Sequence, residues 1–512
     1  MIRGSARGSV VLMVGQVASN LLAAVGVIWV TGLLGDVAMG EVTVVFVPAT
    51  ILLLFQDLGI NAAMTRFGAR WRHEGRLRDL GVLLRTGLLL NSIVAAVLSL
   101  VMWLAAPLIA DGFLHEPTLE VVVRAASFLV LGQALINSTQ AILVGLERMP
   151  LKSLAQIVWA VLKTIFTVGL VLVGLGPLGA VAGSAIAVVL TGVLGILLVF
   201  YSLRPSGGDG SSLTQGEALR ILLGFGLPYY ASTLIAGGLS QVYSSLMTLY
   251  ITRDLIGNYA AATNFGVLVS FLTTPIGTVL FPLFSKIPRG SPNLKRMFQS
   301  AVKYTAFITL PVALGLIVVA GSLIDVIYPS QYPFAAEYMQ VYLVLFLFEG
   351  LGGLSLGNLI VATGETRVIL WSNVVTFVVG VPLSLWLIPS FGIDGLLIAM
   401  IVAPKVSLVY QLWWVKRTLG FSVDWGSSAR LYTSALGAFA ISYPVSNMLG
   451  LGGWAGLLSG VAVYGILYLV LSPLLGALTK ADIADLSQVV DVAGPFARPI
   501  RVVLGLVGRL AR

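Results

Sequence analysis

Hydrophobic residues in this chain occur in long continuous runs, and charged residues gather in the gaps between the runs. Each run has about 20 to 30 residues, enough to cross a bilayer core about 30 Å thick as an α-helix. Strands are not expected, because a membrane-spanning strand needs alternating apolar and polar positions and these runs have none. The pattern predicts an all-α polytopic membrane protein with fourteen transmembrane helices, at residues 8–32, 39–64, 81–105, 121–144, 153–174, 178–201, 221–249, 255–281, 300–324, 336–362, 368–388, 391–415, 430–448 and 452–475.

The composition agrees with this class. Hydrophobic residues make up 58% of the 512 residues, charged residues only 10%, and the mean hydropathy is +0.99. A soluble domain of this length could not bury so much apolar surface. The first run is too long for a signal peptide and has no cleavage-like tail, so we expect a retained helix. Because the chain has no cysteine, disulfides, thiolate metal sites and cysteine nucleophiles are excluded.

The basic residues predict the orientation. With the N-terminus in the cytoplasm, 27 of the 30 lysines and arginines fall on the cytoplasmic side, Arg124 and Arg253 fall outside, and Lys163 lies within the membrane. The outer loops instead carry acids such as Asp111 and Glu116. This asymmetry predicts a multi-pass cell-membrane protein with both termini in the cytoplasm. The net charge of +9 is attributed to the same rule and to anionic lipid headgroups, so nucleic acid is not an expected partner.

The densest basic cluster follows the second run and comprises Arg66, Arg70, Arg72, Arg76 and Arg78. Attraction to anionic headgroups accounts for such a cluster without any role in transport. Arg66 also belongs to a motif that recurs later in the chain, and it is therefore kept as a candidate coupling or gating residue.

No stretch between the runs is long enough to enclose a soluble core. Residues 205–212 have a flexible-linker composition. The tail from Pro499 alternates apolar and basic residues, as an amphipathic helix on a membrane surface does. We expect an N-terminal lobe with helices 1–6 (1–203), a cytoplasmic linker (204–220), a C-terminal lobe with helices 7–12 (221–417), helices 13 and 14 (429–476) and a cytoplasmic amphipathic tail (477–512).

The two predicted lobes share short motifs at a nearly constant offset. The paired segments are Gly59 with Gly277, GLER (145–148) with GETR (364–367), and GPLGAVAGSAIA (176–187) with GIDGLLIAMIVA (392–403). Since six helices per repeat is an even number, equivalent helices point the same way and the repeats are parallel. This predicts two parallel six-helix lobes around a central cleft, plus two extra C-terminal helices.

Five motifs, in their order and spacing, resemble the polysaccharide-biosynthesis (O-antigen type) flippases of the multidrug/oligosaccharidyl-lipid/polysaccharide exporter superfamily: DLGINAAMTRF (57–67), GLERMPLKS (145–153), GLGPLGAVAGSAIA (174–187), PIGTVLFPLFSKI (275–287) and VATGETR (361–367). The resemblance covers the whole chain. It implies alternating-access movement of a polyprenyl-phosphate- or diphosphate-linked oligosaccharide from the inner to the outer leaflet. The related lipid II flippases have an arginine-rich central cavity, whereas the first run here has no basic residue after Arg7.

Amides and hydroxyls at helical spacing suit the hydroxyl groups of a sugar. Such side chains occur in the first, fourth and seventh runs, and the candidate substrate-binding residues are Gln16, Asn20, Gln133, Asn137, Gln140, Tyr229 and Gln241. Polar residues also hold membrane helices together with no role in transport. Because the set extends over several helices, a hydrated cleft is the favoured interpretation.

Charged residues inside the runs are stronger signals, because a charge at the bilayer centre costs at least about 2.5–3.5 kcal/mol. Lys163 lies near the middle of its run and is the candidate cation for the substrate phosphate. Asp57 and Glu349 are candidates for coupling to a proton or a sodium ion, and Asp57 also for a structural or gating role. The alternative for Lys163 is an ion pair with an acid that holds helices in place.

A flippase for lipid-linked glycans is the leading hypothesis, and a cation-coupled drug or metabolite exporter of the same superfamily is the alternative. A membrane-embedded glycosyltransferase or polymerase is disfavoured, because the outer loops are too short for its acidic or metal-binding groups. A purely structural scaffold would not explain the polar helix faces. With no P-loop, direct use of ATP is not expected, and neither is a metal or other cofactor. A monomer is the default.

Overall fold

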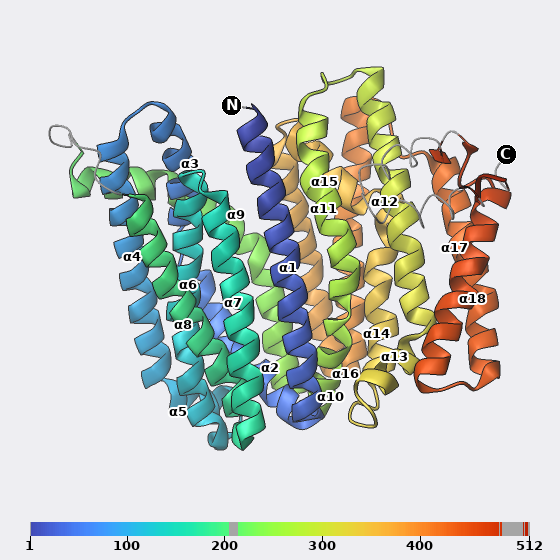
Figure 1. Ribbon diagram of the computed structural model, residues 1–512, viewed down its shortest axis with the longest axis horizontal. Helices are drawn as coiled ribbons and strands as arrows, with labels where there is room; N and C mark the ends of the chain where they lie inside the picture. The colour runs from blue at the N-terminus through green and yellow to red at the C-terminus, as the bar shows by residue number, and fades with distance from the viewer. Residues whose placement is uncertain (1, 204–212, 481, 484–504, 506, 510–512) are drawn as a thin grey trace. The chain divides into compact units, whose positions relative to one another are not determined.

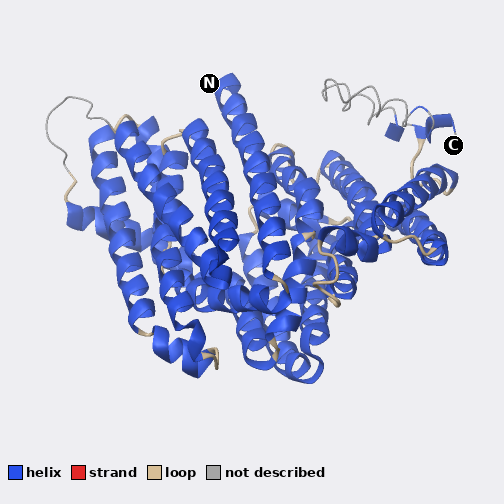
Figure 2. Cartoon of the chain, turned by 60° about the horizontal axis from the view of Figure 1, so that its bottom comes forward, coloured by secondary structure: helices blue, strands red, loops and turns tan. Residues whose placement is uncertain are grey.

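The computed structural model describes residues 2–203, 213–480, 482–483, 505 and 507–509, and within this part of the chain every regular element is a helix (Figures 1 and 2). The predicted all-α polytopic class is confirmed. Residues 204–212 of the predicted linker and 484–504 of the predicted tail lie outside the described residues.

Packing divides the chain into two compact units, the first made of residues 1–264 and 380–396. Its helices are α1 (Ile2–Leu34), α2 (Asp36–Leu54), α3 (Ile60–His73), α4 (Leu77–Leu104), α5 (Ala106–Leu108), α6 (Glu120–Gly145), α7 (Met149–Leu170), α8 (Gly176–Ser202), α9 (Gln215–Tyr250) and α10 (Arg253–Asn264), with π turns η1 (Ile109–Phe113) and η3 (Val171–Leu175) and the 3₁₀ turn η2 (Pro117–Leu119). A core of fully buried residues, including Ile60, Leu83 and Leu222, joins α3, α4 and α9.

The second unit comprises residues 265–379 and 397–512. Its helices are α11 (Gly266–Ser285), α12 (Pro292–Val318), α13 (Ala320–Ile327), α14 (Ala335–Leu343), the 3₁₀ segment η4 (Val344–Leu351), α15 (Gly353–Ala362), the ends of α16 (Thr366–Leu419), α17 (Trp425–Leu449) and α18 (Gly453–Leu474). A separate core packs Phe284, Phe298 and Leu359 from α11, α12 and α15. The predicted division of the chain into lobes remains a prediction, as does the central cleft.

Among the described residues, ten helices are long and apolar enough to cross a membrane, or eleven if the bent pair α14–η4 and α15 counts as one span. Two of the ten are stretches of 54 residues, about 80 Å if straight and far more than one crossing needs. Each contains a glycine with non-helical dihedral angles, Gly174 and Gly392, where two helices meet. Dividing both stretches there and including α14–α15 gives thirteen spans. The remaining predicted run, 430–448, corresponds to α17, which is not among the helices apolar enough to cross a membrane, so the fourteenth span stays a prediction.

The glycines at these two junctions also test the predicted duplication, in which Gly176 is paired with Gly392. Gly176 has φ 50° and ψ −131°, and Gly392, 216 positions later, has φ 60° and ψ −132°. Only glycine adopts this conformation readily. The two motifs that begin at Gly176 and Gly392 therefore make the same turn. The pairing of Gly59 with Gly277 is wrong in this respect. Gly59 has φ 75° at a break between helices, whereas Gly277 lies inside the continuous helix α11.

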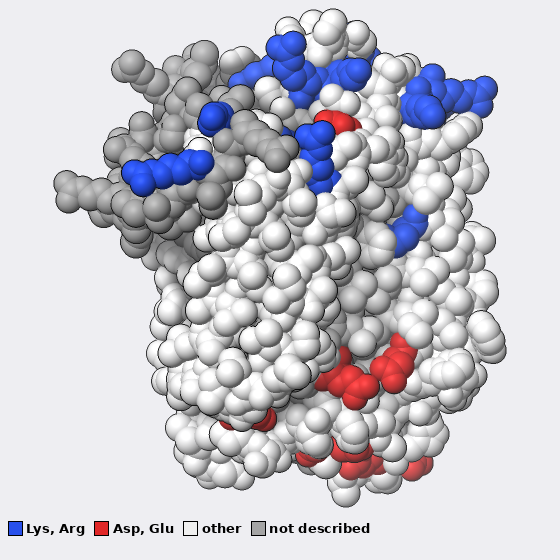
Figure 3. Space-filling view, turned by 90° about the vertical axis from the view of Figure 1, so that its right-hand side faces the viewer, with Lys and Arg blue, Asp and Glu red and all other residues white. Residues whose placement is uncertain are grey.

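Charge is segregated along the helices. On the face drawn in Figure 3, most lysine and arginine side chains gather at one end and most aspartate and glutamate side chains lie toward the opposite end, although an acidic group also lies among the basic ones. This is the distribution on which the predicted orientation depends.

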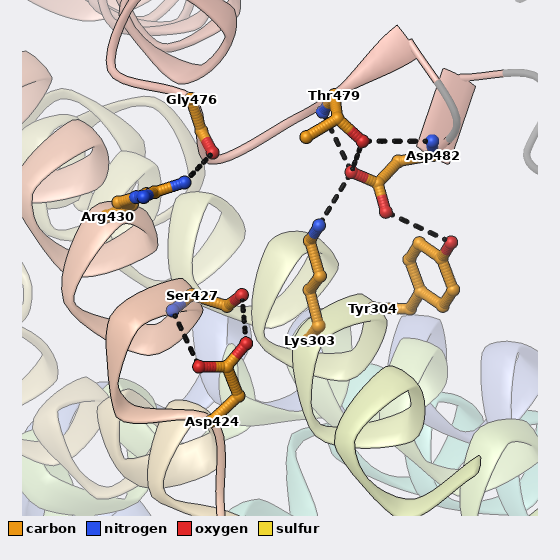
Figure 4. Close-up of polar contacts among 8 residues, drawn as sticks. All are labelled: Lys303, Tyr304, Asp424, Ser427, Arg430, Gly476, Thr479 and Asp482. Carbon is orange, nitrogen blue, oxygen red and sulfur yellow. Dashed lines mark hydrogen bonds and ion pairs between the residues drawn. The ribbon is translucent and has the colours of Figure 1, made fainter. Parts of the chain in front are cut away.

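The segment after α18 is fastened to α12 and α17 of the same unit (Figure 4). Lys303 Nζ donates to Asp482 Oδ2 at 2.6 Å, and the Thr479 backbone N–H donates to the same oxygen at 2.8 Å. Tyr304 donates to the other carboxylate oxygen at 3.3 Å, and Arg430 donates to the Gly476 carbonyl at 3.4 Å. The start of the predicted tail is therefore held by an ion pair that is largely shielded from solvent.

Candidate functional site

Small residues let α1 and α7 approach closely, and this brings polar side chains together. A Cβ at Gly15 would lie 2.6 Å from Ser153 Cβ, and one at Gly26 would lie 2.3 Å from Thr164 Oγ1, so neither position has room for a larger residue. Close backbone approach at small residues is the usual way in which membrane helices associate. Ser19 adds a hydrogen bond from its hydroxyl to the Gln156 carbonyl at 2.8 Å.

Between these contacts lies a row of polar groups, which we call the α1–α7 polar stripe: Gln16, Asn20, Gln156, Trp159 and Lys163. Gln156 Nε2 donates to Gln16 Oε1 at 2.6 Å, and Gln16 Nε2 donates to Asn20 Oδ1 at 2.9 Å. The predicted pair Gln16 and Asn20 is thus in contact. Buried polar atoms usually have a partner, but Gln156 Oε1 and Trp159 Nε1 are buried and have none.

Lys163 occupies the end of the stripe. Its ammonium lies 5.4 Å from the centre of the Trp159 ring, a cation–π distance. It forms no ion pair with any described residue. The alternative in which an acid holds Lys163 in place therefore finds no support among the described residues, and the charge remains available to an anion.

Asp57 lies in a break between α2 and α3. The chain leaves α2 at Leu54, and Leu58 (φ 47°) and Gly59 (φ 75°) turn it into α3. Asp57 Oδ1 accepts the backbone N–H of Asn61 at 2.8 Å, so the carboxylate caps the new helix. Asn91 of α4 donates to Asn61 Oδ1 at 2.9 Å and to Ser138 of α6 at 3.0 Å.

Glu349 lies in a comparable break in the second unit. The 3₁₀ segment η4 ends at Gly352 (φ 92°), and Glu349 Oε2 accepts the N–H of Leu354 at 2.7 Å over the first turn of α15. Lys405 of α16 interacts electrostatically with Glu349, lies 4.1 Å from the Phe348 ring centre and donates to the Leu345 carbonyl at 3.3 Å.

Side chains of α17 satisfy two further carbonyls of the same break. Ser428 donates to Gly350 at 2.6 Å, and the Tyr432 hydroxyl donates to Leu347. Inside a membrane, a backbone carbonyl outside a regular helix costs free energy unless it accepts a hydrogen bond, and these side chains provide one. The second break is therefore held by three donors from other helices.

The remaining predicted residues are distributed over other parts of the first unit. Gln133 donates to Asn137 at 3.0 Å on the solvent-accessible face of α6, where Gln140 also lies. Gln241 of α9 accepts from Thr50 of α2 at 3.0 Å.

Two predicted residues lie at the junction of α3 and α9. The guanidinium of Arg66 lies 4.5 Å from the centre of the Phe225 ring. The same ring stacks on Tyr229 at a centroid distance of 6.3 Å. No hydrogen bond joins the Arg66 guanidinium or the α6 amides to the α1–α7 polar stripe within the described residues.

A pocket of about 520 Å³ lies between α11 and α15 in the second unit. Its walls carry Thr273, Thr274, Thr278 and Asn358 beside the ring of Phe281. Hydroxyl and amide groups beside an aromatic ring form a surface that a sugar can contact.

Sequence reasoning missed several members of these sites. Gln156 and Trp159 precede Lys163 by seven and four residues, so helical spacing places them on its face. Lys405 lies inside the run 391–415, and the criterion applied to Lys163 identifies it too; assigning it to the cytoplasmic side overlooked this. Asn91 gives no local signal, because only tertiary packing brings it to Asp57.

Comparison with known proteins places the chain among membrane transporters. The family model described as "Polysaccharide biosynthesis protein" matches residues 5–288. The chain is 20% identical to the lipid II flippase MurJ of Bacillus subtilis over 467 residues, 81% of this chain and 83% of that protein. It is 22% identical to the probable flippase AglR of Haloferax volcanii over 267 residues, about half of each chain (51% and 53%). A solved structure of the lipid II flippase MurJ in an inward closed conformation superposes with a TM-score of 0.73 at 14% identity, covering 90% of this chain and 99% of that one.

Proposed function

The chain belongs to the polysaccharide biosynthesis protein family, and we propose that it moves a polyprenyl-phosphate- or diphosphate-linked oligosaccharide from the inner to the outer leaflet by alternating access. The family match, the fold shared with the lipid II flippase MurJ and the relatives named as flippases support this proposal. In this proposal the protein is a transporter and not an enzyme, and the lipid-linked oligosaccharide and the surrounding lipids are its partners.

The observation that carries the proposal is the α1–α7 polar stripe. An ammonium without an acidic partner inside an apolar helix is costly unless an anion meets it. Beside Lys163, the unsatisfied Gln156 Oε1 is an acceptor and the unsatisfied Trp159 Nε1–H is a donor. A phosphate on the ammonium and sugar hydroxyls on the amide and indole would satisfy all three groups.

Other polar residues have secondary roles in this proposal. Gln133, Asn137 and Gln140 of α6, with Tyr229 and Gln241 of α9, form further contacts to the glycan as it moves. A proton or sodium ion acts at Asp57 or Glu349, and Arg66 gates the cytoplasmic end of α3. The protein resides in the cell membrane as a monomer with both termini in the cytoplasm, an orientation that the segregation of charge supports (Figure 3).

The test is leaflet-resolved movement of a fluorescent polyprenyl-linked oligosaccharide in proteoliposomes. We expect Lys163→Ala to slow movement at least about tenfold, because the buried phosphate loses a charge-assisted hydrogen bond. Lys163→Arg should restore part of the rate, since it keeps the charge. Lys295→Ala is the control for the loss of a lysine, since Lys295 is an exposed lysine on α12.

Loss of movement in Lys163→Ala alone supports both the function and the role of the lysine. Equal rates in Lys163→Ala and Lys295→Ala would reject that role and keep the function. Absence of movement with several glycan lipids, together with uptake of cationic dyes, would favour the drug-exporter alternative.

A further inference from the structure

We propose that the break between α2 and α3 binds a sodium ion, with the Asp57 carboxylate as its charged ligand. The role of this ion in driving transport rests on the proposed function. The inference assigns the ion to Asp57 and not to Glu349. Binding itself can be measured without any glycan lipid.

The first step is charge. No lysine or arginine among the described residues lies within 4.0 Å of the Asp57 carboxylate. Its partners are the neutral amides of Asn61 and Asn91. Glu349 has no lysine or arginine within 4.0 Å either, but it interacts electrostatically with Lys405, whereas no such interaction with a cation is found for Asp57. A half-buried carboxylate without a counter-ion is stabilised by a cation from solvent.

The second step is a set of buried polar atoms without partners on residues that interact with Asp57 or precede it directly in the chain. Asn91 has an exposed fraction of 0%; its amide nitrogen makes two hydrogen bonds, yet Oδ1 is buried and accepts none. Gln56 is 1% exposed and its Nε2 has no partner, and the hydroxyl of Tyr230, which interacts with Asp57, has none. Each such group costs about 1–3 kcal/mol if it stays unsatisfied. A hydrated cation could be coordinated by Asn91 Oδ1 and Tyr230 Oη. A water molecule bound to the cation would accept a hydrogen bond from Gln56 Nε2.

The third step is the backbone. After α2 ends, the carbonyl oxygens of Leu54, Phe55 and Gln56 accept no hydrogen bond from a described residue. Unwound carbonyls at the C-terminal end of a half-helix are common sodium ligands in transporters. The position of α9 also favours a fixed site, because a Cβ at Gly59 would lie 2.0 Å from the Gly226 carbonyl oxygen, so the break packs directly on α9.

The ligand set selects the ion. It consists of one carboxylate with amide, phenol and carbonyl oxygens, which are hard ligands with a single negative charge. The described residues contain no group of three or more histidine, cysteine, aspartate or glutamate side chains that could hold a metal. A calcium site usually supplies more carboxylate than this. A monovalent cation therefore fits the charge of the site, and a proton on Asp57 is the rival occupant.

The experiment uses the full-length protein in detergent. Thermal unfolding is followed as sodium chloride replaces choline chloride at constant ionic strength, and ²²Na⁺ binding is measured on the same preparation. We expect a saturable rise in melting temperature with sodium, absent in Asp57→Asn, and a weakening of the apparent Kd at least tenfold in Asn91→Ala. Glu349→Gln tests the rival acid, and Glu365→Gln, at an exposed acid outside both breaks, is the matched control that should keep the sodium response.

Three results would overturn the proposal: no ²²Na⁺ binding to the wild-type protein, equal sodium stabilisation in Asp57→Asn, or loss of the response in Glu349→Gln but not in Asp57→Asn. A wild-type protein whose stability responds to pH but not to sodium would assign the site to a proton. If Asn91→Ala does not fold, direct binding to the wild-type and Asp57→Asn proteins still decides. Sodium binding without glycan movement would reject the proposed function alone.

Discussion

Each compact unit contains one interrupted membrane helix in which a carboxylate caps the helix that follows. In the first unit Asp57 Oδ1 accepts the N–H of Asn61 at 2.8 Å beside Gly59, and in the second Glu349 Oε2 accepts the N–H of Leu354 at 2.7 Å beside Gly352. The two breaks share a backbone solution, because a glycine with positive φ permits the turn and an acid satisfies the freed donors.

They differ in how the charge is compensated. Glu349 has Lys405 beside it, and Ser428 and Tyr432 satisfy the unwound carbonyls. Asp57 has only neutral amides nearby, and Asn91 Oδ1 and the Tyr230 hydroxyl are unsatisfied. The second break is complete in the protein alone, whereas the first lacks a cation. The same local fold can therefore serve as a structural element in one place and as an ion site in another.

The largest expected effect is a difference in the free energy of unfolding between alanine substitutions at Gly59 and at Gly352. A Cβ at Gly59 would lie 2.0 Å from a backbone oxygen of Gly226, whereas a Cβ at Gly352 would meet side chains alone, Leu356 at 3.1 Å and Val302 at 3.6 Å. Both substitutions also strain a positive φ, by about 1 kcal/mol. Gly59→Ala should lower the free energy of unfolding by about 4 kcal/mol and Gly352→Ala by about 1–2 kcal/mol, in denaturant titrations of the detergent-solubilised protein.

Gly81→Ala is the control for these substitutions, because no atom lies within 4 Å of the added methyl group on α4. It should be neutral or stabilise by up to about 1 kcal/mol. Equal losses of unfolding free energy in Gly59→Ala and Gly352→Ala would show that the contact of Gly59 with α9 does not make the first break more sensitive than the second.

The next effect tests charge compensation. Lys405→Met removes the electrostatic interaction with Glu349 and the hydrogen bond to the Leu345 carbonyl. It should cost about 2–3 kcal/mol, as the loss of hydrogen bonding by a charged group does. The double variant Glu349→Gln/Lys405→Met should recover at least half of this loss in the same titrations. Asp57→Asn, measured without sodium, should cost less than about 1 kcal/mol, because asparagine still accepts the capping N–H. An undiminished stability of Lys405→Met would remove the contrast between the two breaks.

The sequence was a good guide to the helices and a poor guide to their breaks. Hydropathy depends on side chains, so it identifies every run. It is insensitive to the backbone between Leu54 and Ile60 or at Gly352, because both interruptions lie inside runs that remain mostly apolar despite Asp57 and Glu349. The paired turns at Gly176 and Gly392 were predictable because only glycine adopts their conformation.

The site was predictable only in part, for a similar reason. Asp57, Lys163 and Glu349 are visible as charges in apolar runs, and Lys405 should have been found in the same way. Partners such as Asn91 and Ser428 come from other helices, and single polar residues of this kind are common in any membrane helix. Which of them meets an acid depends on packing that no local pattern encodes.

The last comparison uses a third carboxylate, Asp482, which lies outside the membrane-spanning helices and has a cation beside it (Figure 4). Burial alone would raise the pKa of Asp482, but hydrogen bonds from Lys303 and Thr479 outweigh it and hold the pKa below its ordinary value. A carboxyl group whose pKa is lowered by folding stabilises the protein above its unfolded pKa of about 3.9, and this stabilisation is lost as the pH falls through the folded pKa. Asp482→Asn should therefore cost about 2 kcal/mol at pH 7 and almost nothing below about pH 3.

Thermal unfolding of the variant and the wild-type protein between pH 3 and pH 7 checks this expectation. Glu365→Gln, which removes an exposed pair with Arg289, is the control and should cost less than about 1 kcal/mol at every pH. A pH-independent difference for Asp482→Asn would mean that the ion pair with Lys303 contributes nothing, and the tail would then be held by its neutral contacts. A difference that grows on acidification would contradict the lowered pKa. The expected result would show that the ionised carboxylate of Asp482 stabilises the fold because Lys303 lies beside it. Asp57 has no such lysine, so its ionised carboxylate should stabilise the fold only when sodium is bound.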